Sequence, residues 1–162
     1  QERSARIAQE VAEVTAALAA LEAERDATRS GLEELENLKA YLRIEQVRFP
    51  NLKVEYDITA EDFMLPCLSV QPLVENAIKH GICKKKGGGP VTVASRDDGK
   101  AYIITITDDG VGFDPSAIPN DERQHIGIEN VRKRLQSMVK GSMKIETAPG
   151  KGTTVTITIP KG

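Results

Sequence analysis

The feature that most constrains the fold of this chain is an alternating run of residues that leads directly into an acidic, glycine-rich loop. Residues 102–107 read Tyr-Ile-Ile-Thr-Ile-Thr, a pattern typical of a half-buried strand. Residues 108–113 follow as Asp-Asp-Gly-Val-Gly-Phe. Paired glycines allow a sharp turn and a close approach to a ligand, and the carboxylate of Asp108 can accept a hydrogen bond from an amine. Because Asp-Gly is also a favoured turn pair, the loop alone is equally consistent with an ordinary turn.

Three further motifs change the interpretation of this loop. They are Leu-Val-Glu-Asn-Ala-Ile-Lys-His-Gly at residues 73–81, His-Ile-Gly-Ile-Glu-Asn-Val-Arg at 125–132 and Gly-Lys-Gly-Thr-Thr at 150–154. Together with residues 108–113, this ordered series resembles the N, G1, G2 and G3 boxes of the ATP-binding fold shared by sensor histidine kinases, gyrase-type ATPases, Hsp90 and mismatch-repair ATPases. The resemblance implies that the chain binds ATP.

Three segments are similar to the LytS-like branch of sensor histidine kinases within that superfamily. They are residues 39–49 (Lys-Ala-Tyr-Leu-Arg-Ile-Glu-Gln-Val-Arg-Phe), 68–77 (Leu-Ser-Val-Gln-Pro-Leu-Val-Glu-Asn-Ala) and 130–135 (Asn-Val-Arg-Lys-Arg-Leu). The resemblance extends over about residues 32–160 and leaves out roughly the first thirty.

The first box supplies the candidate metal and phosphate ligands. The resemblance makes Asn76 the Mg²⁺ ligand through its side-chain oxygen, with Lys79 and His80 reaching phosphate oxygens. It gives Glu75 the role of orienting water on the metal or of acting as a base. On a helix, Asn76 and His80 are four residues apart, as are Glu75 and Lys79, so each pair shares a face. The alternative for Glu75 and Lys79 is a surface ion pair worth a few tenths of a kcal/mol.

The other boxes supply the expected base and phosphate contacts. Asp108 is the expected acceptor for the adenine amino group, and the neighbouring Asp109 is expected to be solvated. Residues 114–124 would form a lid over the nucleotide. His125 stands where many relatives have a glycine, and the lid has no separate phenylalanine box. Gly110 and Gly112 are expected to make room for base and ribose. Gly127 is expected to begin a helix whose N–H groups meet phosphate, with Asn130 and Arg132 within reach. In the last box, Gly152 and Thr153, together with Gly150, either support the adenine pocket or simply form a hairpin turn.

The periodicity along the chain predicts an α/β fold in which one mixed sheet carries helices on one face. The expected helices are residues 1–49, 70–80 and 127–139, and the expected strands are 53–58, 91–95, 101–107, 143–147 and 153–159, with a hairpin turn at 97–100. We interpret this as a two-layer α/β sandwich of the Bergerat type. Residues 1–49 are expected to form a dimerisation helix, and residues 50–162 an ATP-binding kinase catalytic domain.

The first 35 residues carry apolar side chains on the four-three spacing of a coiled coil. The stripe consists of Ile7, Val11, Val14, Leu18, Leu21, Thr28, Leu32 and Leu35, and Arg25 interrupts it. The pattern favours a parallel homodimer. Because Gly31 and the turn around Arg25 and Thr28 weaken the stripe, a helix that packs only on its own domain is the alternative.

Composition limits the classes of partner. A chain of 162 residues fits one domain with an appendage, and a net charge of −2 from well-mixed residues gives no electrostatic reason to expect nucleic acid or an anionic membrane. The sequence holds no apolar stretch of the roughly 20 residues that a membrane span needs, so we expect a cytoplasmic domain. Because it begins at Gln1, we allow for a membrane-anchored or sensory segment in the parent protein. Cys67 and Cys83 lack the spacing of a zinc site and are expected to be reduced thiols.

The phosphoacceptor expected from the resemblance is missing. In that family, phosphate passes from ATP to a histidine within a motif near Pro-His-Phe-Leu-Phe-Asn, whereas the two histidines of this chain, His80 and His125, lie inside the nucleotide boxes. We therefore predict an ATP-binding catalytic domain of a two-component sensor histidine kinase, which donates the γ-phosphoryl group to a histidine outside this chain and then to a response regulator. One alternative is an anti-sigma-factor-type serine kinase, against which residues 41–49 and 130–135 argue. The other is a coiled-coil scaffold with a vestigial nucleotide site.

Overall fold

The centre of the structure is a mixed five-stranded sheet. A computed structural model of the chain describes residues 2–25, 28–82, 85–112 and 122–161. The strands lie in the order β2 (Leu52–Ile58), β4 (Gly89–Asp97), β5 (Ala101–Asp108), β7 (Thr153–Pro160) and β6 (Ser142–Thr147). β2 runs parallel to β4, and every other neighbouring pair is antiparallel. The predicted mixed sheet and the β4–β5 hairpin are confirmed.

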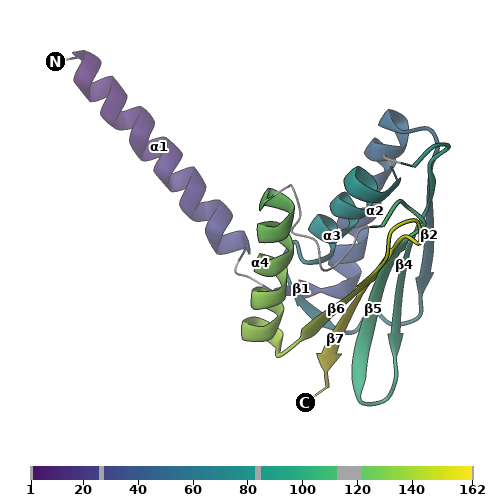
Figure 1. Cartoon of the computed structure of the whole chain (residues 1–162). Coiled ribbons are helices and arrows are strands. Elements are labelled where there is room, and N and C mark those ends of the chain that lie inside the picture. The colour runs from purple at the N-terminus through teal and green to yellow at the C-terminus, as the bar shows by residue number, and fades with distance from the viewer. Residues whose placement is uncertain (1, 26–27, 83–84, 113–121, 162) are drawn as a thin grey trace.

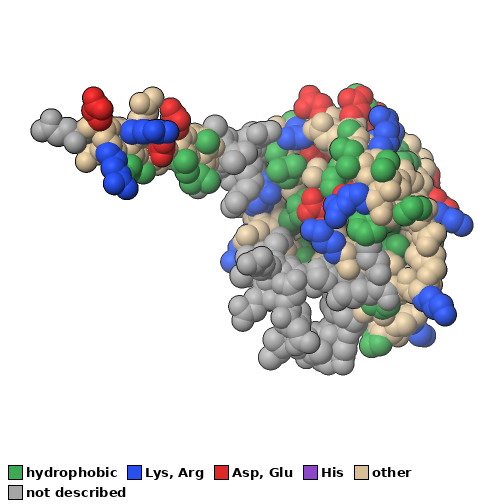
Figure 2. Space-filling view, turned by 90° about the horizontal axis from the view of Figure 1, so that it is seen from above, with side chains coloured by type: hydrophobic (Ala, Val, Ile, Leu, Met, Phe, Trp, Pro, Cys, Tyr) green, Lys and Arg blue, Asp and Glu red, His purple; other side chains and the backbone are tan. Residues whose placement is uncertain are grey.

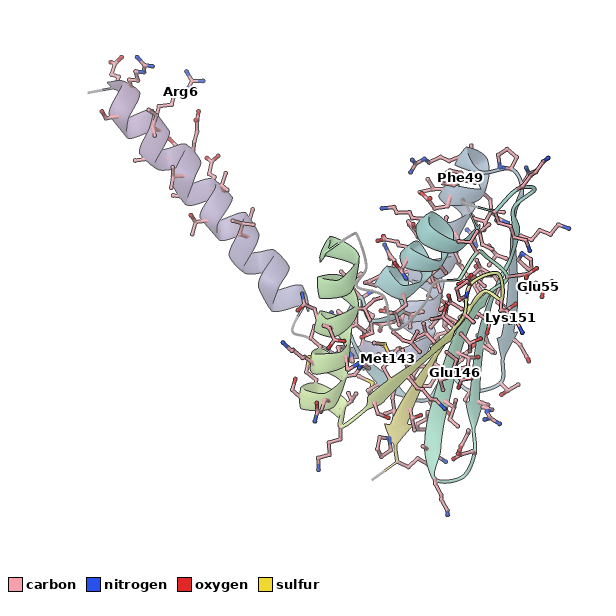
Figure 3. The ribbon with its side chains drawn as sticks, viewed as in Figure 1. Arg6, Phe49, Glu55, Met143, Glu146 and Lys151 are labelled. Atoms are coloured by element: carbon pink, nitrogen blue, oxygen red, sulfur yellow. The ribbon has the colours of Figure 1, made fainter. Side chains whose placement is uncertain are left out.

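One face of this sheet is covered by helices (Figure 1). They are α2 (Gly31–Arg48), α3 (Val70–Asn76), which continues as the π-helix η1 (Ala77–Gly81), and α4 (Glu122–Val139). The core lies between the two layers, because alternate strand residues point toward the helices. Its members include Val91, Val93, Ile104, Ile106, Val155 and Ile157 from the sheet, and Leu38, Leu42, Leu73, Val74, Val131 and Leu135 from the helices. Met143 of β6 lies between α4 and the sheet (Figure 3). The predicted two-layer α/β sandwich is confirmed.

The prediction of one continuous helix over residues 1–49 is wrong. The structure has a helix α1 (Glu2–Arg25), a short strand β1 (Thr28–Ser30) and then α2. β1 pairs antiparallel with β3 (Met64–Pro66), which removes its residues from any helix. Ser30 then starts α2, because its side chain accepts a hydrogen bond from Glu33 N (3.2 Å), as an N-cap residue does.

Because of this break, α1 and α2 have different surroundings. Leu35, Leu38 and Leu42 of α2 are buried in the domain core, so the predicted boundary at residues 49 and 50 falls inside a packed unit. α1 instead projects away from the rest of the molecule, with Arg6 near its far end (Figures 1 and 3). The side chain of Leu21 lies outside the described residues. Whether α1 forms a dimer stays a prediction.

Two smaller corrections concern the elements around the site. The predicted helix 70–80 is present, but its last turn is a π-helix. The helix predicted to begin at Gly127 begins at Glu122, so the predicted lid overlaps α4, and residues 113–121 lie outside the described part of the chain. Among the described residues, no helix has the length and apolar character needed to cross a membrane.

Candidate functional site

Asp108 lies at the carboxyl end of β5 and is the centre of the candidate site. In the sheet it is opposite Val91 of β4 and Thr153 of β7, which keeps only 5% of its surface exposed. Its Oδ1 accepts a hydrogen bond from the backbone N–H of Gly110 (2.9 Å). A carboxylate has about four acceptor sites, so Asp108 retains capacity for a further donor.

The surroundings of Asp108 make the charged carboxylate costly. Burial raises the pKa of Asp108 above its ordinary value of 3.8, hydrogen bonds from the backbone of Gly110 and Thr153 lower it, and the negative charge of Asp109 raises it again. Burial is the largest of these effects, so the net shift is upward. A raised pKa in a buried, incompletely satisfied carboxylate is the property expected of a ligand-binding acid.

Two glycines bring the backbone of η1 directly against this carboxylate. A Cβ added at Gly81 would lie 2.6 Å from Asp108 Oδ1, and one added at Gly110 would lie 2.7 Å from the same atom. The Cβ at Gly110 would also collide with the backbone of Gly81. The absence of both side chains therefore lets the end of η1, the loop after β5 and Asp108 meet. From the sequence, Gly81 is expected only to end the predicted helix 70–80, although its place at the end of the first box pointed to the site.

Two further glycines join this loop to the β6–β7 connection. Gly112 has φ +64° and packs against the carbonyl oxygen of Ala148, while Gly152 has φ +72° and packs against the carbonyl oxygen of Asp108. Only glycine adopts such a φ readily, and a side chain at either position would overlap backbone atoms. The N–H of Gly150 donates to Val111 O (2.6 Å), which fastens the two loops together. The structure thus brings Gly110, Gly112, Gly152 and Thr153 together around Asp108; their contact with nucleotide stays a prediction.

The candidate metal and phosphate residues lie on the helix that ends at this loop. Glu75 and Asn76 are half-buried at the end of α3, and the wide π-turn begins immediately after Asn76. Such turns are frequent at functional sites. Glu75 accepts a hydrogen bond from Gln71 Nε2 (3.3 Å), and the side chain of Lys79 is exposed. The side chain of His80 lies outside the described residues.

The prediction for Gly127 is wrong in part. Because α4 begins at Glu122, Gly127 lies inside the helix, and its N–H is not one of the free donors of a first turn. Asn130 is exposed on α4, and Arg132 Nη1 lies 3.7 Å from Glu129 Oε1. The side chain of His125 is outside the described residues. This contact of Arg132 therefore stays within α4.

Lys85 is a site residue that the sequence did not single out. Its sequence context, the basic and glycine-rich residues 84–90, predicts only a flexible loop, but its Nζ donates to Asp109 O (2.8 Å) and lies 2.9 Å from Asp109 Oδ2. Asp109, expected to be solvated, is exposed but ion-paired. The run of lysines at 84–86 was the available signal. The pair ties the segment after η1 to the loop after β5.

Comparison with known proteins identifies the family to which this geometry corresponds. Residues 65–162 match the family described as histidine kinase-, DNA gyrase B-, and HSP90-like ATPase. The chain is 38% identical over 133 residues to the uncharacterised protein YwpD of Bacillus subtilis, covering 78% of this chain and 48% of YwpD. It is 39% identical over 134 residues to the sensor histidine kinase YpdA of Escherichia coli, and 31% identical over 140 residues to the sensor protein LytS of Bacillus subtilis. In both cases the match covers 78% of this chain and 24% of the relative.

Solved structures support the fold. The histidine kinase domain of a blue-light activated kinase from Erythrobacter litoralis matches with a TM-score of 0.63 at 23% identity, covering 83% of this chain and 68% of that one. The catalytic domain of the histidine kinase ThkA matches with a TM-score of 0.61 at 16% identity, covering 83% and 95%. The predicted resemblance is confirmed. The chain spans half or less of the length of these curated relatives, so the activity of a whole protein is not established by them.

The raised pKa of Asp108 predicts how an Asp108→Asn variant responds to pH. The folded chain binds the proton of Asp108 more tightly than the unfolded chain, so the stability from this group is fully present below pH 3.8 and is lost as the pH rises through the raised folded pKa. Asparagine keeps the size and an acceptor without this loss. The melting temperature of the variant minus that of the parent should therefore be larger at pH 7 than at about pH 3.5. Calorimetric melting at both pH values measures the gain; an equal difference at both would contradict the prediction.

Proposed function

Since the chain belongs to the histidine kinase-, DNA gyrase B-, and HSP90-like ATPase family, we propose that it binds ATP and donates the γ-phosphoryl group to a histidine on another part of a two-component sensor kinase. The observation that carries the proposal is the buried, incompletely satisfied carboxylate of Asp108 at the meeting point of three glycine-containing segments. An exocyclic amine is the donor that such a carboxylate lacks. Adenine offers that amine, and guanine presents an oxygen in its place.

The residues present fit a nucleotide and its metal. Around Asp108, the missing side chains at Gly110, Gly112 and Gly152 let η1 and the two loops pack backbone against backbone, which would hold the carboxylate in place for the base. Asn76 lies on the helix that ends at Asp108 and would hold Mg²⁺ through its amide oxygen, with Glu75 orienting water. When bound, Mg²⁺ supplies positive charge for the phosphate oxygens. Lys79, His80, Asn130 and Arg132 are the residues proposed to contact the phosphates.

Catalysis in such a site consists of positioning and charge neutralisation, because phosphoryl transfer needs little covalent participation from the protein. The role of this chain is to bind the donor and exclude water from the base. The two histidines of the sequence belong to the nucleotide boxes, so the acceptor histidine would lie elsewhere and its phosphate would pass to a response regulator. The relatives YpdA and LytS, both named as sensors, favour this reading over a serine kinase. The domain would act in the cytoplasm, where ATP is available, as part of a parent protein that is anchored in the membrane.

The proposal includes a homodimer formed by α1. Ile7, Val11, Val14 and Leu18 are each more than half exposed, and they occupy one stripe of the projecting helix. Figure 2 shows apolar side chains on this helix among acidic and basic ones. Beside the stripe, Arg6 pairs with Glu10 at 3.3 Å, four residues on. An apolar stripe with charged flanks is the arrangement that a second helix covers in a coiled coil.

Base recognition is tested with Asp108→Asn. A hydrogen bond to an ionised acceptor in a dry site is worth about 1.5–3 kcal/mol, or roughly tenfold to a hundredfold in affinity. The variant should therefore bind ATP more weakly by about that factor, and the parent should reject GTP. Asp57→Asn is the matched control, because it changes an exposed carboxylate on the edge strand β2 and should keep ATP affinity. Calorimetric titration with circular dichroism of each variant gives the result. Unchanged ATP affinity in a folded Asp108→Asn protein, or tight GTP binding by the parent, would refute the role of Asp108.

The metal role of Asn76 is tested by titration with Mg²⁺ and with EDTA. The parent should bind ATP more tightly with Mg²⁺, and Asn76→Ala should remove most of that difference while leaving affinity in EDTA nearly unchanged. Asn37→Ala, an exposed asparagine on α2, is the control. Equal affinity of the parent in both solutions would show that Asn76 is not a metal ligand.

The α1 homodimer is tested by charge. Val14→Glu combined with Leu18→Glu places charges in the apolar stripe and should turn a dimer at micromolar concentration into a monomer that still binds ATP. The control is Ala12→Glu with Ala16→Glu, which adds the same charges outside the stripe and should leave the dimer intact. Light scattering measures the mass. A monomeric parent would overturn the coiled-coil proposal without affecting the nucleotide site.

A further inference from the structure

The first turn of α3 is capped by a residue from another helix. Ser69 precedes α3 but has helical backbone angles, and its hydroxyl donates to Pro66 O (2.6 Å), so it does not cap the helix. The carboxylate of Glu34 on α2 does this instead. Its Oε1 accepts from Val70 N (3.2 Å) and its Oε2 from Leu68 N (3.4 Å). Only 2% of Glu34 is exposed. The start of α3 therefore depends on a side chain 36 residues earlier in the sequence.

Glu34 is in turn held by an arginine on β1. Arg29 Nε lies 3.5 Å from Glu34 Oε2 and also donates to Cys67 Sγ (3.1 Å). From α4, Arg134 donates to the carbonyl oxygen of Cys67. We refer to Arg29, Glu34, Cys67 and Arg134 as the Glu34 cluster. It joins β1, α2, the connection between β3 and α3, and α4.

The backbone at Leu68 depends on this cluster. Leu68 has φ +57°, in the left-handed region that a leucine rarely adopts. In that conformation its N–H donates to Glu34 Oε2. Residues hold such a backbone only where their surroundings compensate for the strain. Glu34 provides that compensation, so its loss should release the turn at residues 67–69 as well as the start of α3.

The helix that begins at the Glu34 cluster ends at Asp108. α3 and η1 form one helical rod from Val70 to Gly81. Asn76 lies along this rod, and Gly81 at its end is packed against Asp108 and Gly110. Because a helix transmits displacement along its axis, the position of its first turn fixes where Gly81 and Asn76 stand relative to the loop after β5.

We propose that Glu34 and Arg29 are positioning residues for the nucleotide site, and that they make nucleotide affinity depend on the β1 segment that follows α1. The contacts of Glu34 and Arg29 described above lie at the Val70 end of this rod, so both residues would act on the site through α3. The proposal rests on the proposed function, since it concerns affinity for adenine nucleotide. Coupling is reciprocal, so nucleotide binding should also slow hydrogen exchange at the Leu68 and Val70 amides.

Glu34→Gln is the most selective test. Both carboxylate oxygens accept hydrogen bonds from N–H groups, whereas a glutamine must present an NH₂ group to one of those donors or to Arg29. Size and packing are otherwise kept. Glu45→Gln is the matched control: Glu45 is also buried on α2, but its Oε1 pairs with Arg48 at 3.2 Å, on the same helix. A purely structural role for buried glutamates on α2 would affect both variants alike.

The experiment measures ADP affinity by calorimetry, with circular dichroism as the folding control, and amide hydrogen exchange without nucleotide. Glu34→Gln should bind ADP about five- to tenfold more weakly and exchange faster at residues 68–77, whereas Glu45→Gln should match the parent in both. Arg29→Lys, which keeps the charge but not the planar fork, should show a smaller loss than Arg29→Gln. If Glu34→Gln does not fold, Arg29→Gln replaces it and should show the same loss of ADP affinity and the same faster exchange at residues 68–77.

The outcomes separate this proposal from the proposed function. Parental ADP affinity in folded Glu34→Gln, or an equal loss in Glu45→Gln, would overturn the positioning role. A parent that binds no adenine nucleotide would refute the proposed function. In that case, unchanged hydrogen exchange at residues 68–77 in Glu34→Gln would overturn the Glu34 proposal. Faster exchange at those residues would support the step in which Glu34 holds the start of α3.

Discussion

The withdrawal of the Asp108 carboxylate from water is the constraint on which the rest of the site depends. Asp108 is buried because it occupies a central strand and because the backbones of Gly81, Gly110 and Gly152 close over it. Any side chain at those glycines would push apart η1, the loop after β5 or the β6–β7 connection. The same contacts that desolvate the carboxylate therefore also shape the place where a ligand donor can reach it. The charged carboxylate costs stability there, as is common where a buried charge serves a ligand.

Much of this arrangement could be predicted from sequence because its determinants are local. The alternating residues of β5 predict a strand, and the acid-glycine pair that follows predicts a sharp turn. A glycine after a helical pattern likewise predicts where the helix ends. The order of the four motifs then indicated that they meet. A local pattern does not show which distant part of the backbone a glycine will pack against. Gly81 was therefore assigned as a helix stop, although it packs on Asp108.

The errors arose where long-range contacts overrule periodicity. The heptad stripe runs through residues 28–35, but pairing of β1 with β3 and the Ser30 cap divide the helix there. A serine three residues before Glu33 was the local signal for a new helix start, and the apolar stripe concealed it. The early start of α4 at Glu122 had a comparable signal in the sequence, an aspartate at position 121 followed three residues later by Gln124. The cap that Glu34 gives to α3 could not be predicted at all, because its partners lie 34 and 36 residues away.

Within the described part of the chain, three carboxylates are buried, and they differ in how the protein satisfies them, in line with the different roles that we propose for Glu34 and Asp108. Glu34 accepts two backbone N–H groups and faces the guanidinium of Arg29, while Glu45 pairs with Arg48. The pKa of Asp108 is lowered by backbone hydrogen bonds, but burial and the negative charge of Asp109 raise it, and burial is the largest effect. A buried acid that lacks a cation is costly unless a ligand completes it. Because α3 and η1 connect Glu34 to Asp108, the acid that is paired with a cation would hold the helix against which Asp108 is proposed to receive its ligand.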